Sequence, residues 1–365
     1  MQNNRSSFFS PFARCALVVF LLVMALYAFA SSSVIVADYL NGTLCYEYRR
    51  MMASFGDLFP FSLFEVLVLS LPITITVVAI LAVRRFRRGE GRVRFVMNFV
   101  AVILLILSGH IIALGIGYKA SPISDRMGIS EVAVDEDSLA DTMIYLMNEV
   151  NELAPKVARD SAGVFDSGYD FDELSAKILE SYGNFYEEYG YPKPFESRAK
   201  GVYHGSLMSY LEITGIYTFF TGEANVNTAF PDFDIVFTTA HELAHQRGIM
   251  RENEANFISY VVCSTSSDEA LRYGGALTMY EYISSALYRT DPDRYTEIAV
   301  GLSDLAWADI LASREVIKKY SNTIIGDISN AVNDAYLKGS GTEGVVSYGR
   351  VVELAVSYIK GKIAE

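Results

Sequence analysis

His241-Glu242-Leu243-Ala244-His245 is the most informative stretch of the sequence, because it uses two of only four histidines among 365 residues. Residues four positions apart lie on one face of an α-helix, about 6 Å from one another. Two imidazoles at this spacing can bind one tetrahedral zinc ion, and a glutamate between them can accept a proton from the zinc-bound water. The stretch therefore predicts one Zn²⁺ ion held by His241 and His245, with Glu242 as the catalytic base.

The flanking sequence predicts two consecutive helices. Pro231, followed by acidic and then apolar residues, marks the start of the first helix, and Gly248 ends it. A second helix begins near Arg251 and includes 252–262. Helices joined by so short a turn pack antiparallel or cross steeply. A carboxylate early in the second helix can therefore face the two histidines of the first.

Glu252 and Glu254 compete for the third position in this zinc site. They lie about 200° apart around a helix, so only one of them can point at the metal. Glu254 shares its face with the apolar residues Phe257, Ile258 and Val261, whereas Glu252 lies on a more polar face. We therefore predict Glu254 as the third ligand, with the fourth position open for water. The alternative interpretation is a buried histidine pair that makes only structural hydrogen bonds.

The composition indicates a membrane protein. Hydrophobic residues make up 51% of the chain and the mean hydropathy is +0.24, which is high for a soluble protein. Three apolar segments, at about 15–36, 61–83 and 95–117, each approach the ~20 residues that span a bilayer. The first could instead be a signal peptide cleaved after Ala30, but we expect an uncleaved span because apolar character resumes at Val34.

Charge predicts the orientation of these spans. The loop 84–94 contains six arginines, and the positive-inside rule places it in the cytoplasm. Residues 1–118, the predicted membrane domain, carry a net charge of +5, whereas the whole chain carries −13, so residues 119–365 carry −18. Such an acidic domain is a poor partner for nucleic acid or an anionic membrane surface. We expect it to be extracytoplasmic, at the outer face of a cytoplasmic membrane.

The extracytoplasmic domain is expected to be mostly helical, with one small sheet. Helical patterns occur at 132–153, 171–189, 268–287, from 291 onward, and at 302–320, 324–336 and 348–363. Short β-prone runs within 199–227 predict a small antiparallel sheet directly before the zinc helix. A peptide substrate could add to the edge of this sheet. Glu223, Asn225 and Asn227 would share one strand face, which either lines the cleft or faces solvent.

Several motifs together resemble a known family. They are Gly215-Ile216-Tyr217, 221–227, 241–246, 252–257, 332–338 and 344–350. This set resembles an uncharacterised bacterial membrane family, domain-of-unknown-function family 3810. That family looks like a membrane-bound branch of the gluzincins, HExxH peptidases whose third zinc ligand is a glutamate on a following helix. The resemblance implies His241, His245 and Glu254 as zinc ligands and Glu242 as the general base, although only eight residues separate His245 from Glu254.

These observations together predict a membrane-bound zinc metallopeptidase that cleaves envelope or secreted polypeptides. Zinc would polarise the scissile carbonyl and lower the pKa of its bound water to about 7, and Glu242 would carry the proton to the leaving amine. The alternatives are a zinc-binding envelope sensor or scaffold with little catalytic activity, and a structural protein without metal. The intact Glu242 argues against both alternatives, because a structural zinc needs no base beside it.

The sequence does not single out the group that would stabilise the oxyanion. Tyr217, Tyr336 and Tyr348 are candidates among 24 tyrosines. We expect His204, the remaining extracytoplasmic histidine, to have a structural role. His110, in the third span, is expected to make a hydrogen bond between packed helices rather than bind metal.

Overall fold

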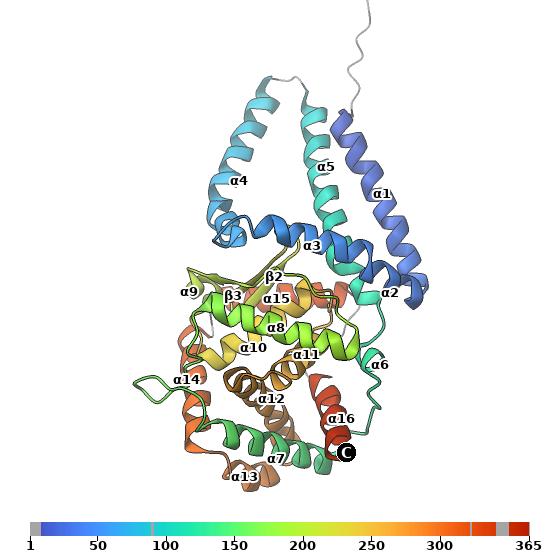
Figure 1. Cartoon of the computed structure of the whole chain (residues 1–365). Helices are drawn as coiled ribbons and strands as arrows, with labels where there is room; N and C mark the ends of the chain where they lie inside the picture. Colours follow the sequence, from blue (N-terminus) through green and yellow to red (C-terminus); the bar gives the residue numbers. More distant parts are fainter. Residues whose placement is uncertain (1–8, 89–90, 322, 341–349, 365) are drawn as a thin grey trace, which may run out of the picture.

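Three long apolar helices stand above a larger helical body in the computed structural model, which describes residues 9–88, 91–321, 323–340 and 350–364 (Figure 1). They are α1 (Pro11–Ser32), α4 (Leu63–Arg88) and α5 (Arg92–His110). Helix α5 continues through a π-helical turn, Ile111–Gly115, and a 3₁₀ turn, Gly117–Lys119. All three helices are long and apolar enough to cross a membrane, which confirms the three predicted apolar segments.

Two helices connect the first two apolar spans. They are α2 (Val34–Gly42) and α3 (Leu44–Gly56), and α3 lies crosswise between the spans and the rest of the molecule (Figure 1). Leu44, Met51 and Phe55 are exposed on α3, at spacings that put them on one face. An amphipathic helix of this kind can lie in the plane of a membrane surface.

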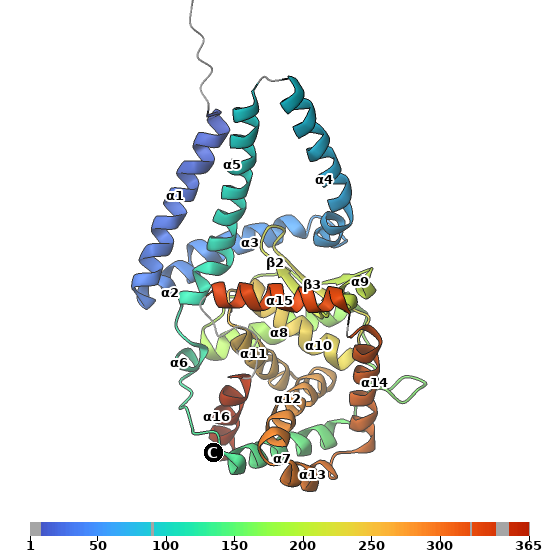
Figure 2. The same cartoon turned by 180° about the vertical axis from the view of Figure 1, so that it is seen from behind.

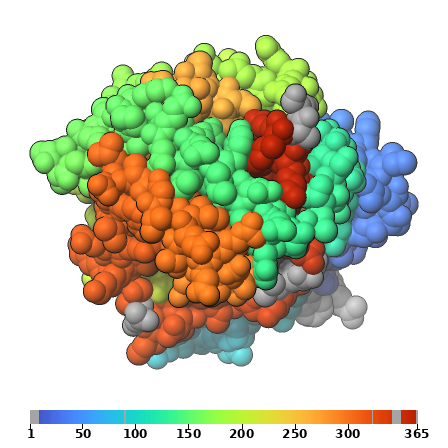
Figure 3. All heavy atoms as spheres, turned by 90° about the horizontal axis from the view of Figure 1, so that it is seen from below, coloured from blue at the N-terminus to red at the C-terminus, as the bar shows by residue number. Residues whose placement is uncertain are grey.

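The body below α3 is built from helices, as predicted. They are α6 (Ile123–Met127), α7 (Glu136–Leu153), α8 (Phe171–Tyr189), α9 (Gly205–Tyr210), α10 (Asp232–Gln246), α11 (Glu252–Ser264), α12 (Glu269–Thr290), α13 (Pro292–Ala299), α14 (Asp304–Tyr320), α15 (Ile324–Gly339) and α16 (Val351–Ala364). Seen from below, α7 and α13 lie side by side and cover this end of the body (Figure 3). The start predicted for the last helix, Tyr348, lies outside the described residues.

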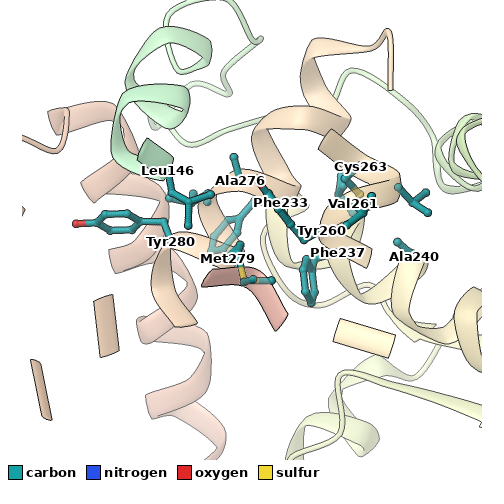
Figure 4. Packing of buried hydrophobic residues seen from close by; sticks show 14 of the residues in the cluster. Leu146, Phe233, Phe237, Ala240, Tyr260, Val261, Cys263, Ala276, Met279 and Tyr280 are labelled. Carbon is teal, nitrogen blue, oxygen red and sulfur yellow. The ribbon is translucent and has the colours of Figure 1, made fainter. Parts of the chain in front are cut away.

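The core lies where α10, α11 and α12 meet (Figure 4). Phe233 from α10, Tyr260 from α11 and Met279 from α12 are all completely buried there. Each such side chain contributes about 1.5–3 kcal/mol by leaving water. Helix α10, which carries the HExxH stretch, is therefore held on several sides and is a rigid support for its histidines.

A three-stranded sheet lies beside α10. It consists of β1 (Lys200–Val202), β2 (Gly215–Thr218) and β3 (Glu223–Asn227), in the order β1-β3-β2. Strands β2 and β3 are antiparallel, but β1 is parallel to β3, so the sheet is mixed rather than antiparallel as predicted. The segment containing α9 separates β1 from β2 in sequence and allows β1 to pair with β3 in the parallel direction. Strand β2 is left at the edge of the sheet.

The polar residues of β3 have a structural role that was not predicted. Glu223, Asn225 and Asn227 are all at least 98% buried, so they neither line a cleft nor face solvent. Glu223 accepts hydrogen bonds from the first two backbone N–H groups of α4 and pairs with Lys200 at 2.7 Å. Asn225 accepts a hydrogen bond from Ser62 at 2.6 Å. These contacts fix the lower end of α4 to the sheet.

Candidate metal centre

The two helices that carry the predicted ligands are joined by a tight turn, as expected. Helix α10 ends at Gln246 and α11 begins at Glu252. Gly248 in the turn has a φ of +103°, a conformation that favours glycine. A Cβ atom at this position would also lie 2.4 Å from the guanidinium of the buried Arg49, so the turn packs directly on the segment below the spans. The turn thereby brings the start of α11 back to the histidines of α10.

His241, His245 and Glu252 form a compact cluster of possible metal ligands, with one ligand atom from each lying within 4.8 Å of the others. A carboxylate oxygen of Glu252 is 3.2 Å from Nε2 of His241 and 3.5 Å from Nε2 of His245. Both imidazoles therefore direct the same nitrogen toward one carboxylate. Two imidazoles and one carboxylate are the donors of a His₂Glu zinc site.

The structure corrects the choice of the third acidic residue, because Glu254 lies away from the histidines. Its carboxylate accepts a hydrogen bond from Arg251 at 2.8 Å and one from the backbone N–H of Ile123 at 3.2 Å. Glu254 is indeed buried, as its apolar helix face predicted, but that face packs against other parts of the body. Helix α11 crosses α10 with its more polar face toward the histidines, and Glu252 lies on that face.

The surrounding groups suit a bound cation. Nδ1 of His245 is 2.7 Å from the carbonyl oxygen of Ile249, an outer contact that fixes the ring and leaves Nε2 for a ligand. Glu242 is 96% buried, and its carboxylate accepts the backbone N–H of Tyr217. Its Oε2 has no hydrogen-bond partner among the described residues. A buried carboxylate oxygen without a partner, beside two histidines and a second carboxylate, fits a zinc site with a catalytic base.

The electrostatics of the cluster favour positive charge at its centre. Burial lowers the pKa of His245, but the neighbouring Glu252 carboxylate outweighs it and raises the pKa to about 9. Burial alone would raise the pKa of Glu252, yet the two histidines together bring it well below its ordinary value. Burial raises the pKa of Glu242. The Glu252 carboxylate therefore favours a positive charge beside it, and a divalent cation would meet the same attraction.

The cluster opens into a cavity of about 710 Å³, which is large enough for a peptide segment. The cavity is lined by the whole of β2, by α10 and by α15, which lies across it below α3 (Figure 2). A residue that stabilises the oxyanion must line this cavity, and Tyr217 and Tyr336 do so. The third candidate, Tyr348, lies outside the described residues. Tyr282 also lines the cavity and was missed, because nothing in the sequence distinguishes it from other tyrosines on buried helices.

The two remaining histidines differ in their relation to the cavity. His204 pairs with Glu65 of α4 at 2.6 Å and does not line the cavity, so its contacts are those of a structural residue. His110 lines the cavity at its upper end. Its ring packs edge-on against Phe219 in the β2–β3 turn and against Tyr336 of α15.

Fold and site together define a mostly helical protein with three potential membrane-spanning helices and a His₂-carboxylate cluster below them. Comparison with known families gives the identification: the family described as "Protein of unknown function (DUF3810)" matches residues 43–356, and the chain belongs to that family. The match includes the second and third apolar helices, the sheet and the cluster of His241, His245 and Glu252. No curated protein and no solved structure matches the chain.

Proposed function

We propose that the chain is a membrane-anchored zinc metallopeptidase of the gluzincin type. One Zn²⁺ ion would be held by His241, His245 and Glu252, with Glu242 as the general base. The observation that supports this most strongly is the convergence of three ligand groups beside Glu242, whose free carboxylate oxygen is buried at the same cavity. A purely structural zinc site has no use for such a base.

Zinc, when bound, supplies a Lewis acid for the scissile carbonyl and lowers the pKa of water. The role of Glu242 follows from its contacts. The N–H of Tyr217 holds its carboxylate, and one oxygen remains free to take a proton and pass it to the leaving amine. A Cβ at Gly215 would lie 2.6 Å from this carboxylate, so the absence of a side chain there lets β2 approach the base closely.

The edge of β2 is suited to binding an extended polypeptide. The backbone N–H of Asn227 donates to the carbonyl of Thr214, which marks Thr214 as a residue that hydrogen-bonds to β3. From there, every second residue along β2 forms backbone hydrogen bonds with β3. In this register the backbone groups of Gly215 and Tyr217 point away from β3, toward the cavity and Glu242. The N–H of Tyr217 already binds Glu242, so a substrate strand would pair with the backbone groups of Gly215 and with the carbonyl of Tyr217. Such a strand would present its peptide bonds beside the metal ligands.

The proposed location follows from the arginine-rich segment 84–94, which joins the upper ends of α4 and α5. With this segment in the cytoplasm, the metal cluster lies on the other side of the cytoplasmic membrane. Polypeptides of the bacterial envelope, or in transit through it, are then the proposed substrates. The strongly acidic extracytoplasmic domain gives no basis for nucleic-acid binding.

The test compares the full-length protein in lipid nanodiscs with two variants, Glu242→Gln and Glu180→Gln. Glu180 is exposed on α8 and serves as the matched control. We expect about one zinc per chain in all three proteins, and cleavage of an unfolded protein such as casein in all but Glu242→Gln. Zinc without cleavage would favour the alternative function, a zinc-binding sensor or scaffold. Absence of zinc from the wild-type protein would overturn the proposal.

A further inference from the structure

We infer that the substrate is a polypeptide anchored in the bilayer by a transmembrane helix, which reaches the metal cluster from between α4 and α5. The inference rests on the proposed peptidase function and names its substrate class. It is carried by the cavity, which extends from the metal cluster to the lower ends of two apolar spans.

The cavity changes in character along its length. At one end lie the polar side chains of the metal cluster and Glu242. At the other end its walls are Phe64 from the first turn of α4, His110 at the end of α5, and Leu114 from the π-helical turn. A soluble substrate has no need of a wall built from transmembrane helices. A chain leaving the bilayer would pass these residues first.

The β2–β3 turn connects the two ends. Phe219 in this turn packs edge-on against the ring of His110, and it lies 3.7 Å from the position of a Cβ at Gly109 in α5. Phe220, beside it, is 43% exposed and also lines the cavity. One end of β2 is therefore the turn that contacts the lower end of α5. Its other end is Gly215, which lies beside Glu242.

Helix α4 packs little against the other two apolar helices. Helices α4 and α5 are close at their upper ends and diverge toward the cavity, whereas α1 packs along α5 (Figures 1 and 2). No described residue of α4 is buried, so its apolar side chains are free to contact either lipid or a substrate helix. Glu223 and Asn225 hold only the lower end of α4.

The length of β2 sets the position of the cut. Four residues, 215–218, separate Glu242 from the turn at the spans. At about 3.3 Å per residue, this strand covers about 13 Å. A substrate strand paired with β2 would then be cleaved about four residues from the β2–β3 turn, and so close to the membrane boundary.

The first part of the test measures cleavage of two matched probes by full-length protein in nanodiscs. One probe is an apolar helix of about 20 residues with a randomised tail on the metal-site side, and the other is the same tail on a soluble carrier. We expect the anchored tail to be cut at least about tenfold faster, near the membrane boundary, and neither probe to be cut by Glu242→Gln. Equal rates would overturn the inference while leaving the peptidase proposal intact.

The second part detects binding without catalysis. A photo-crosslinking phenylalanine analogue replaces Phe64 or, as a matched control, Phe29 in the Glu242→Gln protein. Phe29 lies in the last turn of α1, and Phe64 lies in the first turn of α4. Phe29 is 64% exposed and does not line the cavity. We expect the anchored probe to crosslink at position 64 and not at 29. Crosslinking to lipid alone, or equally at both positions, would overturn the inference. A crosslink specific to position 64 without cleavage by wild-type protein would support the substrate route and overturn peptide hydrolysis.

Discussion

At the scale of single residues, Glu252 and Glu254 have opposite surroundings although they are two positions apart. Glu252 faces two imidazoles, and Glu254 is bound to Arg251 and the start of α6. We expect Glu252→Gln to weaken zinc binding by more than about 100-fold with little change in folding. Glu254→Gln should keep zinc and lower the free energy of unfolding by about 1–3 kcal/mol. Zinc titration and thermal unfolding of both variants test this; zinc loss in Glu254→Gln alone would restore Glu254 as the ligand.

Gly215 offers a second test at this scale, because its missing side chain creates the space for Glu242. A Cβ there would lie 2.6 Å from Glu242 and 2.7 Å from Thr238. We expect Gly215→Ala to displace the base and reduce peptidase activity at least about tenfold while zinc content is unchanged. Gly183→Ala is the control, since a Cβ in this part of α8 meets nothing within 4 Å and should leave activity unchanged. Equal activity of the two variants would contradict the assigned role of Gly215.

The sequence predicted part of this cluster and not the rest, for a physical reason. The spacing of His241 and His245 follows from helix geometry, so their convergence needs no tertiary information. Choosing between Glu252 and Glu254 requires the direction in which α11 crosses α10. Burial was a misleading criterion, because a carboxylate can be buried against an arginine, as Glu254 is, as readily as against a metal.

At the scale of elements, the packing of α3 on the β2–β3 turn depends on Gly222. Its φ is +71°, and a Cβ there would lie 2.2 Å from the backbone nitrogen of Ala53 in α3. Gly222→Ala should therefore cost more than the ~1–2 kcal/mol of a left-handed alanine alone. Gly163→Ala isolates that smaller cost, because Gly163 has a φ of +82° and nothing within 4 Å. Thermal unfolding of both variants in nanodiscs compares their losses of stability. Equal losses would show that α3 can move away from the added methyl group at little cost in free energy.

The helices that were predicted are determined by local sequence signals, whereas the pairing of the strands is determined by long-range contacts. Helix α8 was predicted at its observed bounds, Phe171–Tyr189, from its periodicity and the following Gly190, and the structure adds a capping box at Asp170. Helix α3 was not predicted, although its exposed residues Leu44, Met51 and Phe55 follow a helical spacing. The parallel pairing of β1 with β3 is a long-range contact that no local pattern records.

At the scale of the whole molecule, the proposed orientation has a direct test. Arg88, at the arginine-rich end of α4, and Tyr288, exposed on α12, should lie on opposite sides of the membrane. We expect Tyr288→Cys to react with an impermeant maleimide in intact spheroplasts, and Arg88→Cys to react only after permeabilisation. Both variants carry Cys15→Ser, because Cys15 is an exposed native thiol, whereas Cys45 and Cys263 are completely buried and should stay unlabelled. The reverse pattern would place the metal cluster in the cytoplasm.

The crosswise position of α3 has one more consequence for a peptidase in a bilayer. The helix packs on the strand turn through Gly222, and the hydrogen bonds of Glu223 hold the lower end of α4, so the histidine–glutamate cluster is fixed relative to the apolar helices. In the proposed peptidase this would keep the cleavage site at a constant distance from the bilayer. Such an enzyme would choose the bond to cut by its distance from the membrane, and the amino acids around that bond could vary widely among its substrates.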